Sequence, residues 1–315
     1  MKITLCVKGY KKILACLRRK LPNDIIEECS PEKTSEAALQ SEILIPVIAP
    51  ITQNILTSKS LKLVQQFGVG LDTIDIEAAN TNKIFVANVP SGGTGNAESV
   101  AELTIGYMIM LSRWINDAQS WFREEKFGAP LGSNIWKSTV AIIGYGDIGR
   151  ALQKRLAGFE VKTIGVFRDQ SSLNSVTQKP DESITFNQLP KLIGTADFII
   201  VTVSGGKANY NLINKNLFRL MKKSAFLINV SRGKTVSYKD LLDALDKKII
   251  AGAALDVFWS EPFDPNDKLF NYNVIATPHI GGATDLSLDG IAQEVANNIN
   301  RIREGLKPIN LATSF

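Results

Sequence analysis

The chain has 315 residues, of which 44% are hydrophobic and 21% charged, close to the average for globular proteins. This balance excludes a disordered or fibrous chain, and the length suffices for about two domains. The apolar runs are shorter than the roughly 20 residues that a membrane-spanning helix needs, so no membrane association is predicted. Lysine and arginine exceed aspartate and glutamate by only 36 − 31 = 5, which solvated helix faces explain without a nucleic-acid partner.

The cysteines and the first residues bear on location. Cys6, Cys16 and Cys29 are the three cysteines, and they show neither CxxC spacing nor an even count. This pattern favours a reducing compartment over a disulfide framework, and it predicts no metal site. Lysines already occur between residues 8 and 12, where an export signal would keep an apolar stretch. The sequence therefore predicts a cytoplasmic protein.

Short apolar runs rich in β-branched residues alternate with segments of helical period, which is typical of βαβ units. In the first hundred residues we expect four strands, at 3–7, 43–48, 61–67 and 84–87. Farther along we expect six, at 139–143, 161–167, 198–203, 225–230, 252–257 and 274–277. The second group reads as one parallel sheet with both faces buried, because its strands are continuously apolar.

Two longer segments of helical period flank the second group of strands, at 97–113 and 285–304. The last one follows the second sheet, so we expect it to return to the first domain. The predicted fold class is α/β, with two doubly wound parallel-sheet domains. A Rossmann cofactor domain, residues 96–289, would be inserted into a flavodoxin-like substrate domain made of residues 1–95 and 290–315.

Aromatic residues gather in the connection between these two groups of strands. Trp114, Trp121 and Trp136 lie close together in sequence, with Phe122 and Phe127 between them. Such a segment can be core packing or a contact surface. Because it falls outside the strand pattern, we favour a subunit interface.

A glycine-rich turn follows the strand predicted at 139–143 and opens a helical segment, the context that a dinucleotide-binding fingerprint requires. The first glycine allows the tight turn, the second lets the backbone approach a pyrophosphate, and the third permits close helix–strand packing. The predicted cofactor-binding turn consists of Gly144, Tyr145, Gly146, Asp147, Ile148 and Gly149.

The end of the next strand bears on the choice of cofactor. It reads Phe167, Arg168, Asp169, so the arginine precedes the first acidic residue. A carboxylate there would bind a free ribose 2′-hydroxyl, whereas an arginine accommodates a 2′-phosphate. The sequence thus favours NADP(H) over NAD(H), with NAD(H) left open.

Three ionisable residues come just after the predicted ends of strands in the second sheet: Arg232, Glu261 and His279, the only histidine. Ligands of open α/β sheets bind beyond these carboxyl ends. An imidazole supported by a carboxylate can exchange a proton with a carbonyl or alcohol oxygen. Arginine pairs with a substrate carboxylate and polarises the reacting carbonyl. We expect the three to converge around the reactive end of a nicotinamide dinucleotide.

Six stretches of the chain resemble the D-isomer-specific 2-hydroxyacid dehydrogenase family, in family order and over nearly the whole length. They are FGVGLDTID (67–75), GTGNAESVAEL (93–103), IGYGDIGR (143–150), NVSRG (229–233), ALDVFWSEP (254–262) and TPHIGG (277–282). One stretch departs from the pattern: VTVSGGKANY at 201–210 replaces the usual proline-containing loop, which affects the expected adenine-side contacts.

The resemblance implies a role for each matching residue. Arg232 would bind the substrate carboxylate, Glu261 would support the imidazole, and His279 would be the acid/base. The amides of Val69 and Gly70 would hold the same carboxylate, so that the implied substrate-binding residues are Val69, Gly70, Arg232 and His279. Asp256 would hold the nicotinamide carboxamide. The other expected cofactor contacts are Phe167, Arg168, Asp169, Val203, Ser204, Val230, Ser231 and Gly281.

The implied activity is reversible reduction of a 2-oxo acid to the D-2-hydroxy acid by a homodimer. The loop at 47–52 is expected to face the substrate side chain, and residues 43–58 contain no lysine or arginine to pair with a phosphate. This disfavours phosphoglycerate and favours glyoxylate, hydroxypyruvate, or a branched or aromatic 2-oxo acid. The alternative is an NAD(P)H-sensing binding protein, such as the corepressors that share this fold.

Overall fold

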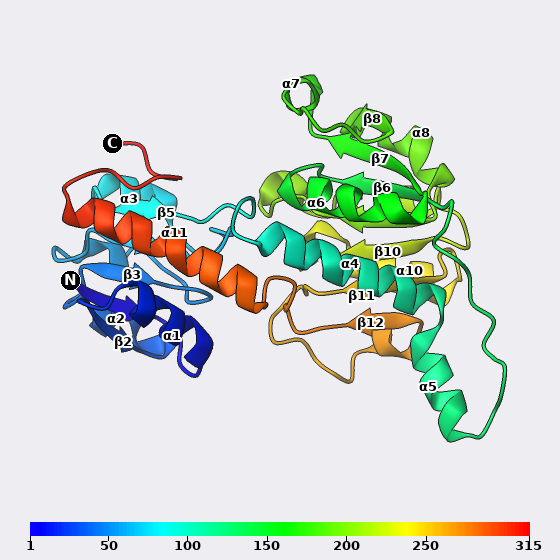
Figure 1. Cartoon of the computed structure of the whole chain (residues 1–315), viewed down its shortest axis with the longest axis horizontal. Helices are drawn as coiled ribbons and strands as arrows, with labels where there is room; N and C mark the ends of the chain where they lie inside the picture. The colour runs from blue at the N-terminus through cyan, green and yellow to red at the C-terminus, as the bar shows by residue number, and fades with distance from the viewer. The chain divides into compact units, whose positions relative to one another are not determined.

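A computed structural model describes all 315 residues (Figure 1). The chain forms two compact units, one made of Met1–Asn96 with Ala283–Phe315 and the other of Ala97–Gly282. The chain returns to the first unit at Ala283, before the last helix, α11 (Asp285–Arg303), and not at residue 290 inside that helix. No helix combines the length and the apolar character that crossing a bilayer requires.

The first unit contains a five-stranded parallel sheet in the order β2-β1-β3-β4-β5, the flavodoxin-like arrangement. Its strands are β1 (Lys2–Leu5), β2 (Ile25–Glu28), β3 (Ile43–Ile45), β4 (Leu63–Gln65) and β5 (Phe85–Ala87). Its helices are α1 (Lys11–Lys20), α2 (Thr34–Ala38), α3 (Ile76–Thr81) and α11.

Side chains alternate across this sheet, so each face has its own core. Ile43 and Ile45 of β3 pack with α1 and α11, whereas Leu44, between them, packs on the opposite face with α3. Both faces are therefore buried, as a sheet built from crossover helices requires.

The second unit contains seven parallel strands in the order β12-β11-β10-β9-β6-β7-β8, a Rossmann arrangement with one added strand. The strands are β6 (Thr139–Ile143), β7 (Lys162–Phe167), β8 (Glu182–Thr185), β9 (Phe198–Val201), β10 (Phe226–Asn229), β11 (Gly252–Leu255) and β12 (Val274–Ala276). The helices are α4 (Asn96–Ser112, whose first residue belongs to the other unit), α5 (Ile115–Arg123), α6 (Asp147–Leu156), α7 (Gln170–Asn174), α8 (Leu189–Leu192), α9 (Lys215–Phe218) and α10 (Tyr238–Asp246).

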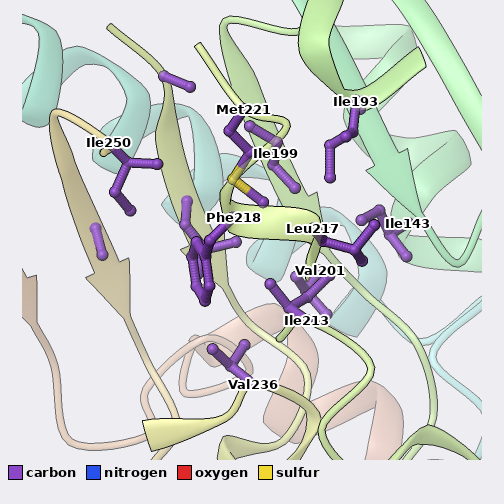
Figure 2. Packing of buried hydrophobic residues seen from close by; sticks show 14 of the residues in the cluster. Ile143, Ile193, Ile199, Val201, Ile213, Leu217, Phe218, Met221, Val236 and Ile250 are labelled. Atoms are coloured by element: carbon purple, nitrogen blue, oxygen red, sulfur yellow. The ribbon is translucent and has the colours of Figure 1, made fainter. Parts of the chain in front are cut away.

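Helices α4 and α6 cover one face of this sheet, and α8, α9 and α10 cover the other. Figure 2 shows the second of these cores, where Leu217, Phe218 and Met221 in and after α9 lie over Ile199 and Val201 of β9. This close packing fixes the strands whose carboxyl ends carry the predicted site residues.

The sequence missed one strand in each sheet, so the predictions of four and six strands were both one short. The missed strands are β2 and β8, and each lies at the edge of its sheet. Their sequences, IIEE and ESIT, are not continuously apolar, because an edge strand is not buried on every side. A search for continuously apolar runs therefore does not find them, although it does find the apolar edge strands β5 and β12.

Candidate functional site

The glycine-rich turn connects β6 to α6, and each of its three glycines has a separate structural reason. Gly144 has a φ of +96°, and a Cβ there would lie 2.7 Å from the backbone nitrogen of Val203. A Cβ on Gly149 would lie 3.1 Å from Ile142 Cγ2, so this glycine allows α6 to approach β6. At Gly146, by contrast, a Cβ would meet nothing within 4 Å.

The space at Gly146 is what a dinucleotide pyrophosphate would need. Gly146 is also the N-cap of α6, and no side chain caps the helix there. The start of a helix presents amide groups and a positive dipole end to an anion. Tyr145 turns inward, where its hydroxyl donates to Gln153 Oε1 at 2.7 Å, and Asp147 pairs with Arg150. The turn thus fits a dinucleotide through its backbone.

The three residues at the end of β7 that are predicted to contact the cofactor have different surroundings. Phe167 is buried and packs on the ring of Tyr145, with centroids 5.3 Å apart. Asp169 caps α7, accepting hydrogen bonds from the Ser172 amide (2.8 Å) and hydroxyl (2.9 Å). These donors hold the pKa of Asp169 below its ordinary value. Arg168 is exposed beside it.

His279 and Glu261 are in direct contact, at 2.8 Å from Nδ1 to Oε2. The other oxygen of Glu261 accepts from the Phe258 amide at 3.1 Å. Partial burial acts to raise the pKa of Glu261, but the bonds from His279 and Phe258, with the charge of Arg232, outweigh it and lower the pKa. An ionised carboxylate only accepts, so Nδ1 carries a proton and Nε2 is the nitrogen left for proton exchange.

Arg232 follows β10 in a tightly held turn. Its backbone oxygen accepts from Asn229 Nδ2 at 3.0 Å and from Thr235 Oγ1 at 2.7 Å, and its Nη1 donates to the Ser231 oxygen at 2.7 Å. A Cβ on the next residue, Gly233, would lie 2.0 Å from the carbonyl carbon of Phe258. Only glycine permits this approach, which brings the arginine turn against the segment that precedes Glu261.

Asp256 anchors the loop that carries His279. Its buried carboxylate accepts from the Thr277 hydroxyl at 2.5 Å and from the amides of Ile280 and Gly281, both at 2.8 Å. A Cβ on Gly281 would lie 2.8 Å from Asp256 Oδ2, so the loop needs a glycine to approach this closely. The contact of Asp256 with a nicotinamide stays a prediction.

The remaining predicted cofactor residues line the same strand ends. Val203 lies against Gly144, and Ser204 accepts from Asn209 Nδ2 at 2.8 Å through its backbone oxygen. Val230 and Ser231 are buried, and the Ser231 hydroxyl donates to Asn229 Oδ1 at 2.9 Å. Their contacts with a cofactor stay predictions.

Val69 and Gly70 belong to the other unit, in the turn after β4. The Val69 oxygen accepts from Asn88 Nδ2 at 2.7 Å, and Gly68 before it has a φ of +125°. This turn is therefore held by a side chain and by a glycine-only conformation. Its role in substrate binding stays a prediction.

Sequence reasoning did not find Tyr107 and Thr277, which lie next to the Asp256 anchor. The Tyr107 hydroxyl contacts Thr277 Oγ1, although the two residues are 170 positions apart. The available signal was a tyrosine within an apolar helix, since a buried hydroxyl needs a partner.

Comparison with known proteins finds relatives in both sequence and structure. Residues 105–281 match the model of the "D-isomer specific 2-hydroxyacid dehydrogenase, NAD binding domain". Glyoxylate reductase from Thermococcus litoralis is 37% identical over 268 residues, covering 80% of this chain and 76% of that protein. Glyoxylate reductase from Pyrococcus horikoshii is 34% identical over 261 residues, with the same shares covered.

A solved structure extends the similarity to both units. The crystal structure of a protein from Thermus thermophilus matches with a TM-score of 0.86 and 25% identity, covering 99% of this chain and 100% of that one. Together with the sequence matches, this similarity favours an enzyme over a cofactor-sensing binding protein.

Proposed function

This chain belongs to the D-isomer specific 2-hydroxyacid dehydrogenase family and is an NAD(P)-dependent oxidoreductase, and on this premise we propose which residues carry its reaction. It reduces a 2-oxo acid to the D-2-hydroxy acid, with His279 as the acid/base. The observation that carries this assignment is the contact of the only histidine with Glu261, at 2.8 Å.

Each residue has one task in the reduction. When bound, the reduced nicotinamide supplies a hydride to the carbonyl carbon. Arg232, with the amides of Val69 and Gly70, binds the substrate carboxylate and orients the carbonyl. His279 gives the proton on Nε2 to the carbonyl oxygen as negative charge develops there, and Glu261 stabilises the charged ring beforehand. In the oxidation of the hydroxy acid, His279 takes that proton back.

Replacing His279 tests the assignment. His279→Ala removes the proton donor, and His279→Gln keeps a polar side chain that cannot titrate. General acid–base catalysis contributes about 10²–10⁴-fold, so both variants should lose kcat by roughly that factor. Dinucleotide affinity, measured by fluorescence titration, should stay unchanged. Full turnover in either variant would refute the role of His279, and a wild-type protein that binds NAD(P)H without reducing any 2-oxo acid would favour the binding-protein alternative.

For the substrate, we propose a small or apolar 2-oxo acid such as glyoxylate or hydroxypyruvate. The loop at 47–52 supports this, because Ile48 and Pro50 are its exposed hydrophobic side chains and it contains no cation. A phosphorylated acid would lack a partner there. A panel of 2-oxo acids, including branched and aromatic ones, assayed by NAD(P)H oxidation, ranks the candidates. A phosphorylated acid as the best substrate would contradict the proposal.

For the cofactor, we propose NADP(H) as the preferred dinucleotide. The support is that Asp169 is engaged by Ser172 as a helix cap, while the exposed Arg168 beside it offers charge to a 2′-phosphate.

We also propose a homodimer in the cytoplasm. Helix α5, labelled in Figure 1, is amphipathic but has no buried residue. Phe122, which belongs to this helix, is 82% exposed. Phe127 and Leu131, in the following segment, are exposed still further. A groove of about 810 Å³ borders the same segment, lined by Ile109, Met110 and Leu131 among others.

The proposed location in the cytoplasm is supported by the three cysteines. All three are free, which fits a reducing compartment.

A further inference from the structure

Helix α4 is linked to the loop of His279 by a chain of hydrogen bonds. The Tyr107 hydroxyl contacts Thr277 Oγ1, which lies 2.5 Å from Asp256 Oδ1. Tyr107 is 1% exposed and Asp256 is 2% exposed. The three residues come from α4, from the end of β12 and from the end of β11, so the fold alone brings them together.

Each hydroxyl in this series of hydrogen bonds donates toward Asp256. The Thr277 hydroxyl donates its single proton to Asp256 Oδ1, which also accepts from the Ile280 amide. The Thr277 oxygen must therefore accept from Tyr107. Burial raises the pKa of the Tyr107 phenol above its ordinary value, so this hydroxyl keeps its proton and remains the donor.

These hydrogen bonds hold the backbone on both sides of His279, the proposed acid/base. Asp256 also accepts from the amides of Ile280 and Gly281, and His279 lies between them and Thr277. His279 has a φ of +54°, in the left-handed region. That conformation is disfavoured for a residue with a Cβ, so the surrounding contacts must impose it.

Resting on the role proposed for His279, we propose that Tyr107 is a positioning residue for the reaction. Its hydroxyl, acting through Thr277 and Asp256, fixes the loop so that the His279 ring meets Glu261 in one orientation. Tyr107 touches neither the ring nor the substrate, and its effect is on how often the ring is correctly placed.

Tyr107→Phe removes one oxygen and retains the ring that packs in the core with Met108 and Ile275. We expect kcat to fall by about tenfold, since small misplacements of a catalytic group cost up to roughly 10²-fold. The Kd for the dinucleotide is measured beside kcat, because Asp256 is also the predicted contact of the nicotinamide carboxamide. Tyr272→Phe is the matched control, because the Tyr272 hydroxyl donates to Asp246 Oδ1 at 2.9 Å without contacting the Asp256 anchor. It should leave kcat unchanged.

The single histidine gives a direct readout of the ring. In protein labelled with ¹³C-histidine, the one imidazole signal belongs to His279 without further assignment. Tyr107→Phe should shift and broaden this signal, whereas Tyr272→Phe should not. A variant with wild-type kcat and a wild-type imidazole signal would overturn the proposal.

Thr277 supplies a second pair of variants that tests the same chain. Thr277→Val removes the relaying hydroxyl and should reproduce the Tyr107→Phe effects, whereas Thr277→Ser keeps the hydroxyl and should restore them toward wild type. This pair decides the matter if Tyr107→Phe fails to fold. If the His279 variants keep full turnover, the proposed acid/base role fails, but the imidazole signal still reports whether Tyr107 holds the ring.

Discussion

At the end of β7, two neighbouring residues of opposite charge have different surroundings. Both residues are exposed, but the Asp169 carboxylate already accepts from the amide and the hydroxyl of Ser172. A ribose 2′-hydroxyl would compete with these internal donors for Asp169. A 2′-phosphate would instead pair with the guanidinium of Arg168, which makes Arg168 the residue to test.

Arg168→Ala should weaken NADPH binding by about tenfold or more, because hydrogen bonds to a charged group contribute roughly 1.5–3 kcal/mol. NADH has no 2′-phosphate, so its affinity should change little. Fluorescence titration with each cofactor measures both, and Lys191→Ala, an exposed cation on α8, serves as the control. Unchanged NADPH affinity would remove the reason for the NADP(H) preference.

Among single residues, the sequence predicted the ionisable residues of the site better than the residues that position them. His279 and Glu261 were expected to meet because both follow strand ends of one sheet, and the structure brings them together. Tyr107 and Thr277 were not expected, since helical periodicity shows that a tyrosine is buried but not which hydroxyl 170 residues later it contacts. Such pairings depend on how a helix lies on the sheet.

In the first unit, the carboxyl end of α11 is bound to the start of the chain through ion pairs with Asp24. The Asp24 side chain is 2% exposed and contacts Arg303 Nη2 at 2.5 Å and the amino group of Met1 at 2.7 Å. Burial acts to raise the pKa of Asp24, but the hydrogen bonds and charges of Arg303 and the amino group outweigh it and lower the pKa. This carboxylate therefore stabilises the fold only while it is ionised.

Asp24→Asn should lower the free energy of unfolding by about 1–3 kcal/mol at pH 7, because it leaves two cations without their buried partner. A lowered folded-state pKa gives stability that is complete above the unfolded pKa of about 3.9 and is lost as pH falls through the folded value. The difference between variant and wild type should thus shrink in acid. Urea denaturation of the untagged chain at several pH values measures it.

Asp289 provides the matched control on the same helix. It also pairs with two cations, Arg19 and Lys20, but its side chain is 43% exposed. Water and salt screen exposed ion pairs, so Asp289→Asn should have only a small effect. Equal losses in the two variants would show that burial does not set the strength of the Asp24 contact.

Strands with a continuously apolar sequence were predictable, including the edge strands β5 and β12, whereas edge strands with polar residues were not. The predicted strand at 139–143 agrees with β6 at both ends, because every central strand is apolar on two faces. The edge strands β2 and β8 carry glutamates and were missed. Several predicted strands also continued past their observed ends, since the residues after a strand stay buried in the connecting loop.

For the molecule as a whole, the exposed aromatic segment around α5 determines the predicted assembly. Phe122→Asp combined with Phe127→Asp places charges where a second copy would bury rings, so we expect a monomer in light scattering after size exclusion. Leu39→Asp changes another exposed apolar residue, in the first unit, and should leave the oligomeric state unchanged. A double variant that stays dimeric would place the interface elsewhere.

The borders of the first sheet bear on how far such assembly can go. Along β5, the tail of the chain adds its own backbone, with a bridge from Ala87 to Leu311 and a hydrogen bond from the Ala312 amide to the Val86 oxygen. On the opposite border, the acidic side chains of β2 would repel an identical strand. Neither edge of this sheet is therefore a template for open-ended growth into fibrils.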